Sequence, residues 1–209
     1  MDYEAVISRN SQQNKNEKDG LHILLISIHG LIRGENLELG RDADTGGQIK
    51  YVLELTRALA QQPEVAQVVL LTRRIDDAQI DDDYAQAVEE LGDGARIVRL
   101  DAGPPDYLPK ETLWDHLDTF TDNALTYLRS TDALPDLVHS HYADGGYVGS
   151  RLSAQLGVPL IHTGHSLGRV KRRRLLATGL DSVSYTHLRA HETNPCSSYA
   201  VFCLKRGGG

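Results

Sequence analysis

Cysteine and long apolar runs are scarce in this sequence of 209 residues. The two cysteines, Cys196 and Cys203, lie close to the C-terminus. We assign them neither a disulfide nor a metal, because the segment that holds them does not read as protein. No apolar run approaches the roughly 20 residues that span a bilayer, and the polar N-terminus carries no apolar signal core. These absences predict a cytoplasmic protein with no membrane partner, preceded by a disordered lead-in over residues 1–20.

Basic charge is also in short supply, since the formal net charge is −7. An acidic chain argues against nucleic acid as a partner, although a local basic patch could still bind phosphate. Two phosphate-binding motifs are absent as well: G-x-G-x-x-G after the first apolar run, and G-x-x-x-x-G-K-[ST]. A dinucleotide fingerprint and a Walker phosphate loop are therefore excluded.

The last segment, residues 182–209, differs from the rest in composition and lacks hydrophobic periodicity. Its "VSYTHLRAHET" resembles the translation of a transposase-type sequencing adapter, "YAVFCLK" resembles the flanking primer region, and "RGGG" is what a run of G bases encodes. The matches occur in the order of a read through an adapter, with "NPC" where a sample index would lie. We predict that residues 182–209 are adapter read-through and disordered, so that the natural sequence is cut after about Asp181. An ordinary disordered tail is the alternative.

Between these ends, short apolar runs alternate with segments of helical periodicity. The runs predict strands at 21–27, 66–72, 95–100, 135–141 and 158–163. The periodic segments predict helices from Gly46 onward, over about 111–129 and over about 145–156. The segment "RRIDDAQIDDDYAQ", residues 73–86, reads as a charged loop. This alternation predicts an α/β fold over residues 21–181, a Rossmann-like, doubly wound parallel sheet that is incomplete at the cut.

A pair of glycines, Gly46 and Gly47, stands where a carboxylate-rich loop enters the first helix. Without a Cβ, the backbone there can approach a ligand closely, and the helix behind it presents free N–H groups and a partial positive charge. Together these features suit a phosphate or diphosphate. A plain loop-to-helix turn is the alternative, and Thr45 or Asp44 could cap the helix.

The other unusual residues also follow predicted strands, where ligands of doubly wound sheets bind. "HYADGG" follows the fourth strand, and "HTGHSLG" follows the fifth, with His165 and Ser166 at the sheet edge. "KRRR", residues 171–174, is either a solvated face or a phosphate site, and Lys110 is a second cation on this edge. A hydrolase is disfavoured because no nucleophile-elbow context surrounds Ser166. No tight metal-ligand spacing joins the histidines, so no metal is expected.

With these residues in view, the chain resembles the sucrose-phosphate synthases, a family of retaining nucleotide-sugar glycosyltransferases with two Rossmann-like domains in a GT-B fold. The resemblance rests on "SIHGLIRGENLELGRDADTGGQIKYVLELTRALA", "LLTRRI", "YLPKETLW", "HYADGGYVG" and "TGHSLGRVKRRRL". It covers essentially all of residues 21–179. It implies transfer of glucose from UDP-glucose to fructose 6-phosphate, giving sucrose 6-phosphate and UDP, without a cofactor. The N-terminal domain would hold the acceptor, and a C-terminal Rossmann-like domain, absent from this sequence, would hold the nucleotide sugar.

The resemblance also implies roles for individual residues. His165 would line the reacting centre as the catalytic residue, and Gly47 would back the donor diphosphate. The acceptor would be contacted by Gly46, Gln48, Lys110, Tyr142, Ser166 and Lys171. With half of the cleft missing, we expect the chain itself to be inactive. Two alternatives stay open: a sucrose synthase-type enzyme that uses free fructose, which shares "DTGGQ", and a non-catalytic module that binds sugar phosphates.

Overall fold

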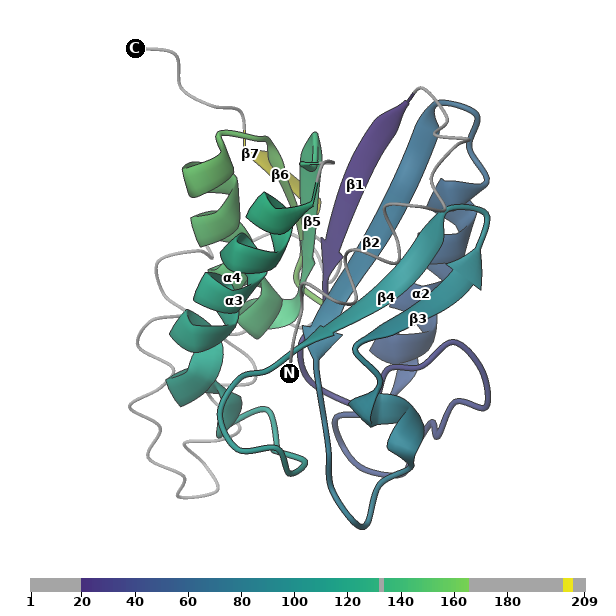
Figure 1. Ribbon diagram of the computed structural model, residues 1–209, viewed down its shortest axis with the longest axis vertical. Helices are drawn as coiled ribbons and strands as arrows, with labels where there is room; N and C mark the ends of the chain where they lie inside the picture. Colours follow the sequence, from purple (N-terminus) through teal and green to yellow (C-terminus); the bar gives the residue numbers. More distant parts are fainter. Residues whose placement is uncertain (1–19, 132–133, 166–200, 205–209) are drawn as a thin grey trace.

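A single seven-stranded sheet organises the computed structural model, which describes residues 20–131, 134–165 and 201–204 (Figure 1). The strand order is β3-β4-β2-β1-β5-β6-β7. The strands are β1 Leu21–Ile26, β2 Val65–Arg73, β3 Val88–Gly92, β4 Ala95–Leu100, β5 Leu137–His141, β6 Leu160–Thr163 and β7 Val201–Leu204. The α-helices are α2 Gly47–Ala60, α3 Leu117–Ser130 and α4 Tyr142–Leu156, with 3₁₀ turns η1 Asp82–Ala85 and η2 Leu113–His116.

The five inner strands are parallel, which confirms the Rossmann-like α/β fold. Both edge strands are antiparallel: β3 pairs with β4, and β7 pairs with β6. Strand β3, "VEELG", follows the charged segment 73–86 and was not predicted from the sequence. That stretch carries glutamates on an edge strand, so it shows no buried apolar run in the sequence.

Helices cover both faces of the sheet, and the side chains of β1 alternate between them. Ile23 and Leu25 pack with α2 on one face. Leu24 and Ile26 pack with α3 and α4 on the other face, and Figure 1 shows these two helices side by side. Burying such a side chain contributes about 1.5–3 kcal/mol, so a strand that is apolar on both faces is fixed in the middle of the sheet.

Two expected boundaries differ from the structure. Helix α4 begins at Tyr142, three residues before the expected Gly145, so "YADGG" is its first turn and not a loop. Val201–Leu204, inside the segment 182–209 that the sequence predicts to be disordered, form β7. The rest of that segment and nearly all of the predicted lead-in lie outside the described residues. In the described part, no helix is both long and apolar enough to cross a membrane.

The order of the strands creates a switch point between β1 and β5. From β1 the chain moves to β2 and β4 on one side, and it then returns to β5 on the other side. Ile26 of β1 pairs with Ser140 of β5, so the loop after β1 and the first turn of α4 leave the sheet next to each other. In Figure 1 the carboxyl ends of β1 and β2 point toward the lower edge of the view. Ligands of open α/β sheets bind beyond such a point.

Candidate functional site at the carboxyl edge of the sheet

The amino end of α2 opens onto this edge. Gly46 is the N-cap, and within the described residues no side chain forms a capping hydrogen bond. The expectation that Thr45 or Asp44 caps α2 is therefore wrong, because both side chains bond elsewhere. A Cβ added at Gly46 or Gly47 would meet no described atom within 4 Å. Among the described residues, nothing therefore blocks a ligand's approach to the backbone at these two glycines, which is what an anion site at a helix amino end needs.

The loop that leads into α2 is held by an internal network centred on Asp42. Its Oδ1 accepts hydrogen bonds from the backbone N–H groups of Asp44, at 2.7 Å, and Thr45, at 2.8 Å. The Thr45 hydroxyl in turn accepts the N–H of Leu31, at 3.2 Å. Burial raises the pKa of Asp42, but these hydrogen bonds outweigh it and lower the pKa overall. The entry to the glycine pair is therefore rigid before any ligand binds.

Gly30 brings the start of this loop against its end. Its φ is +82°, and a Cβ there would lie 2.6 Å from the carbonyl oxygen of Asp44. Only glycine combines this backbone conformation with so close an approach. Beside it, Gln48 donates a hydrogen bond from Nε2 to the Ser27 hydroxyl, at 3.2 Å, which ties the first turn of α2 to the end of β1.

Lys110 lies at this edge as expected, but it is already paired. Its ammonium forms an ion pair with the buried carboxylate of Asp44, and its backbone N–H donates to the same carboxylate, at 2.8 Å. Burial lowers the pKa of Lys110, but the hydrogen bond and charge of Asp44 outweigh it and raise the pKa overall. A phosphate that bound here would share Lys110 with Asp44.

His29 and Asp144 form a buried pair across the switch point. His29 Nδ1 lies 2.7 Å from Asp144 Oδ2, and the side chains are 4% and 1% exposed. Asp144 Oδ1 accepts the backbone N–H of Gly145, at 2.7 Å. Burial lowers the pKa of His29, but the charge and hydrogen bond of Asp144 raise it by more, and Asp44 adds to the rise.

Tyr142 stands against this pair. Its φ is +63°, which a large side chain rarely adopts, and its ring contacts that of His29 edge-on with centroids 4.6 Å apart. Among the site residues expected from sequence, Gly46, Gly47, Gln48, Lys110, Tyr142 and His165 all lie at this edge. Ser166, Lys171 and the basic run that follows it lie outside the described residues.

Three histidines at the ends of β5 and β6 form a second group, defined here as the histidine cluster: His139, His141 and His165. His165 Nε2 lies 3.0 Å from His141 Nδ1, and the rings of His139 and His141 are 4.3 Å apart. His139 also bonds the Thr163 hydroxyl, at 2.9 Å. Tyr51 of α2 contacts the rings of His141 and His165 edge-on.

Burial and mutual repulsion keep this cluster neutral. Burial is the main cause in each case, and it lowers the pKa of His139 and His165 to about 4 and that of His141 to about 2. Neighbouring histidines add to each fall, while Asp144 partly opposes it for His165. At neutral pH the expected catalytic residue, His165, is therefore a neutral hydrogen-bonding group and not a cation.

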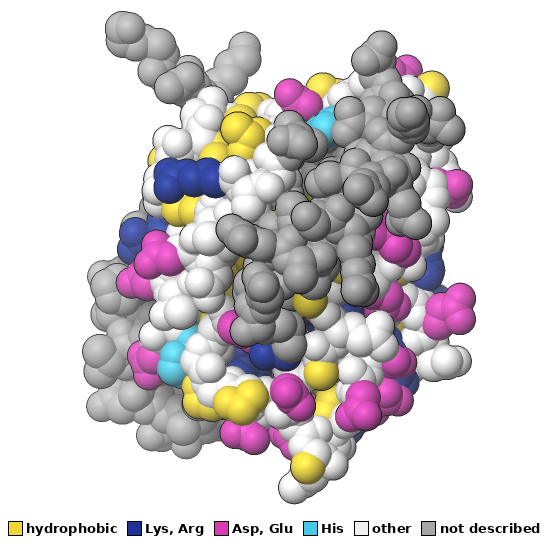
Figure 2. Space-filling view, in the orientation of Figure 1, with side chains coloured by type: hydrophobic (Ala, Val, Ile, Leu, Met, Phe, Trp, Pro, Cys, Tyr) yellow, Lys and Arg dark blue, Asp and Glu magenta, His cyan; other side chains and the backbone are white. Residues whose placement is uncertain are grey.

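Sequence reasoning overlooked the two carboxylates that organise the site. Asp44 was considered only as a helix cap, and Asp144 was read as part of a glycine-rich loop. The missed signal is that each carboxylate lies at the start of a helix that follows a switch-point strand: Asp44 lies just before α2, and Asp144 lies in the first turn of α4. Figure 2 shows acidic side chains gathered on the lower part of the visible face, the end at which the parallel strands terminate.

Comparison with known proteins agrees with this geometry. Residues 46–192 match the glycosyl transferase 4-like domain. The chain belongs to this glycosyltransferase family. The family match begins at Gly46, the residue that opens α2, and it includes α4, β6 and the histidine cluster.

Individual relatives of this glycosyltransferase chain are sucrose-phosphate synthases. A probable sucrose-phosphate synthase 4 of Oryza sativa subsp. japonica is 46% identical over 196 residues, and the sucrose-phosphate synthase of Zea mays is 45% identical over 194 residues. Each alignment covers 81% of this chain but only 18% of the relative. A solved sucrose-phosphate synthase of Thermosynechococcus elongatus superposes with a TM-score of 0.60 and 34% identity, covering 73% of this chain and 35% of that one.

Proposed function

We propose that this chain is the acceptor-binding half of a sucrose-phosphate synthase, which transfers glucose from UDP-glucose to fructose 6-phosphate with retention at the anomeric carbon. The observation that carries the proposal is the convergence of three features at one switch point: the open amino end of α2, the Lys110–Asp44 pair and the neutral His165. The similarity to sucrose-phosphate synthases supports the choice of substrates.

The proposed chemistry depends on position and charge. Main-chain amides at Gly46 and Gly47 would face phosphate oxygens, because a helix amino end stabilises negative charge. His165, neutral at working pH, would exchange hydrogen bonds with a sugar hydroxyl at the reacting centre. A front-face transfer assisted by the leaving phosphate asks the protein to orient two substrates and to stabilise developing charge.

The donor half of the cleft would come from a second Rossmann-like domain. The chain spans about a fifth of the length of the curated relatives that it matches, which supports this division. The protein alone should then bind the acceptor and show no transfer. Assay of the 209-residue chain with UDP-glucose and fructose 6-phosphate tests the division, and clear turnover would refute it.

The choice of acceptor is tested by calorimetry on the same chain. Fructose 6-phosphate should bind more tightly than fructose, and Lys110→Met should remove most of that preference because it removes a phosphate partner. Lys110→Arg, which keeps the charge, is the matched control. Equal binding of both sugars would instead favour the free-fructose alternative. Binding of neither sugar would overturn the proposal.

A further inference from the structure

The His29–Asp144 pair has a built geometry that the proposed reaction does not by itself require. Its partners are 115 positions apart in the sequence and meet only because β1 and β5 are neighbours. Both oxygens of Asp144 are used, one by His29 and the other by the N–H of Gly145. A buried pair of this kind gains little net stability, because taking two charged groups out of water costs about as much as their attraction returns. Such a pair needs another explanation than stability.

Tyr142 supplies that explanation. It is the first residue of α4, and its left-handed backbone is strained for a bulky side chain. The His29 ring lies against the Tyr142 ring, and Asp144 lies in the same helical turn as Tyr142. Strain of this kind persists only where the surroundings hold it. Here the imidazole supports the tyrosine ring, and the carboxylate fixes the imidazole.

We infer that His29 and Asp144 are positioning residues, which hold the Tyr142 side chain at the edge of the site where a sugar-phosphate acceptor would lie. The identity of that acceptor rests on the proposed function, whereas the positioning itself does not. Tyr142 would touch the acceptor, and His29 and Asp144 would act through it.

The charge on His29 is part of this arrangement. Asp144 and Tyr142 face it from α4, Asp44 faces it from the loop after β1, Lys110 faces it from the loop after β4, and His165 lies beyond β6. The carboxylates prevail over Lys110 and burial, so the pKa of His29 is raised. With a proton on Nδ1, the His29 ring donates a hydrogen bond to Asp144 Oδ2, and this bond orients the ring. Loss of the carboxylate would lower the pKa of His29 and remove the hydrogen-bond partner that orients its ring.

Nuclear magnetic resonance on the 209-residue chain tests the positioning directly. In the wild type, the His29 ring should titrate above the ordinary histidine value. In Asp144→Asn the pKa of His29 should be lower than in the wild type, and the Tyr142 ring resonances should move with it. Asp118→Asn, an exposed change on α3, is the matched control and should leave both signals in place. An unchanged His29 titration in a folded Asp144→Asn protein would overturn the inference.

A second variant guards against failure to fold. His29→Asn removes the ring that supports Tyr142 but leaves Asp144 a hydrogen-bond partner, and it should also move the Tyr142 resonances. By calorimetry, either variant should weaken fructose 6-phosphate binding about tenfold. If both variants bind as the wild type does, the inference is wrong. If the wild type binds no sugar while the resonances respond as expected, the proposed function fails and the positioning stands.

Discussion

Histidines in two places at one sheet edge meet opposite surroundings. His29, after β1, faces the carboxylate of Asp144 at 2.7 Å, and its pKa is raised. The histidine cluster, on β5 and just after β6, is dominated by burial and by neighbouring imidazoles, and the pKa of each member is lowered. The pKa of the same side chain is therefore raised on one side of the switch point and lowered on the other, because the carboxylate of Asp144 outweighs burial only for His29. The surroundings of each histidine, and not its residue type alone, determine the direction of its pKa shift.

Lowering the pH should have the largest effect on the free energy of unfolding, because the folded protein opposes protonation of the histidine cluster but not of His29. A lowered pKa means that the stability from the cluster is present above the unfolded value, near 6.5, and is lost as the pH falls toward the folded values. At pH 5 the unfolded chain protonates each of these histidines while the folded cluster keeps them neutral, which lowers the free energy of unfolding by about 2 kcal/mol for each, and by less for half-buried His165. Between pH 7 and pH 5 the free energy of unfolding should therefore fall by on the order of 4 kcal/mol. Urea unfolding at these two pH values measures it.

His29 contributes with the opposite sign. Its raised pKa gives stability that is complete below about pH 6.5 and is lost as the pH rises through the folded value. The free energy of unfolding should therefore be greatest near neutral pH. His165→Gln, which removes one titrating member of the cluster, should reduce the acid slope. An unfolding midpoint that stays level from pH 7 to pH 5 would contradict the account of the cluster.

Gly145→Ala should disturb the His29–Asp144 pair while leaving the residues of the histidine cluster unchanged. A Cβ at Gly145 would lie 2.9 Å from the Ile26 carbonyl oxygen, so α4 must move away from β1 and carry Asp144 with it. Overpacking of this kind costs about 1–3 kcal/mol. Chemical denaturation should show that loss, and the His29 titration should fall toward its ordinary value.

Gly47→Ala is the matched control for that change. Its Cβ meets no described atom within 4 Å, and alanine favours the helix, so the stability should stay level or rise by up to about 1 kcal/mol. If both alanine variants were equally stable, close packing of α4 on β1 would not be the role of Gly145.

The strands were predictable from the sequence, whereas the start of α4 and the role of Asp144 were not. The five parallel strands were found because runs such as "LHILLI" are apolar on both faces, and a local pattern is enough to reveal that. The helix was expected only from Gly145, although residues 142–144 already lie inside α4. Gly145 and Gly146 leave room there for Ile26 and His162. The role of Asp144 depends on a partner 115 positions away, and no local pattern carries that information.

Tyr51→Ala should sharpen the comparison from the cluster side. The ring of Tyr51 lies edge-on to His165, with centroids 5.3 Å apart, and to His141, at 6.0 Å. Removing it should cost about 1 kcal/mol of aromatic contact and admit water, so the pKa of His165 should rise from about 4 toward its ordinary value. Tyr51→Phe keeps the ring and should leave the pKa low. The ring signals of His165 measure both variants, and a low pKa in the alanine variant would show that Tyr51 does not shield it.

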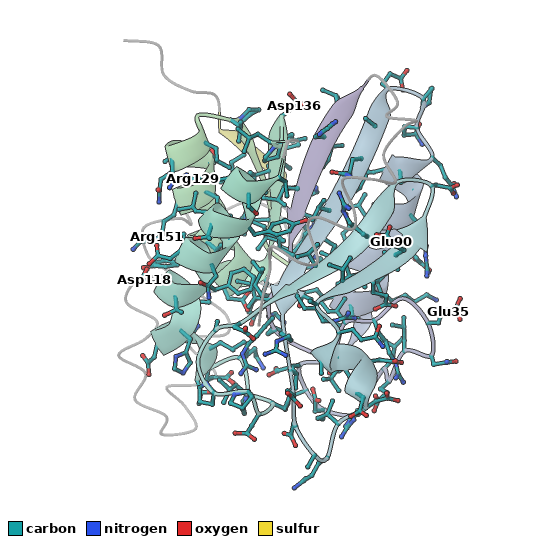
Figure 3. The ribbon with its side chains drawn as sticks, in the orientation of Figure 1. Glu35, Glu90, Asp118, Arg129, Asp136 and Arg151 are labelled. Carbon is teal, nitrogen blue, oxygen red and sulfur yellow. The ribbon has the colours of Figure 1, made fainter. Side chains whose placement is uncertain are left out.

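The smallest effect is expected where a carboxylate meets a cation in water. Asp118 of α3 and Arg151 of α4 lie close together on the outer side of the helices (Figure 3), with Oδ1 and Nη2 3.5 Å apart and both side chains exposed. Water screens such a pair, so Asp118→Asn should change the free energy of unfolding by less than about 0.5 kcal/mol, equally at pH 6 and pH 8. Asp144→Asn should cost more at pH 6 than at pH 8, because below the folded pKa of His29 it leaves a buried cation without its partner. If the two variants showed the same pH dependence, the contrast between a buried carboxylate and an exposed one would not explain the charge of His29.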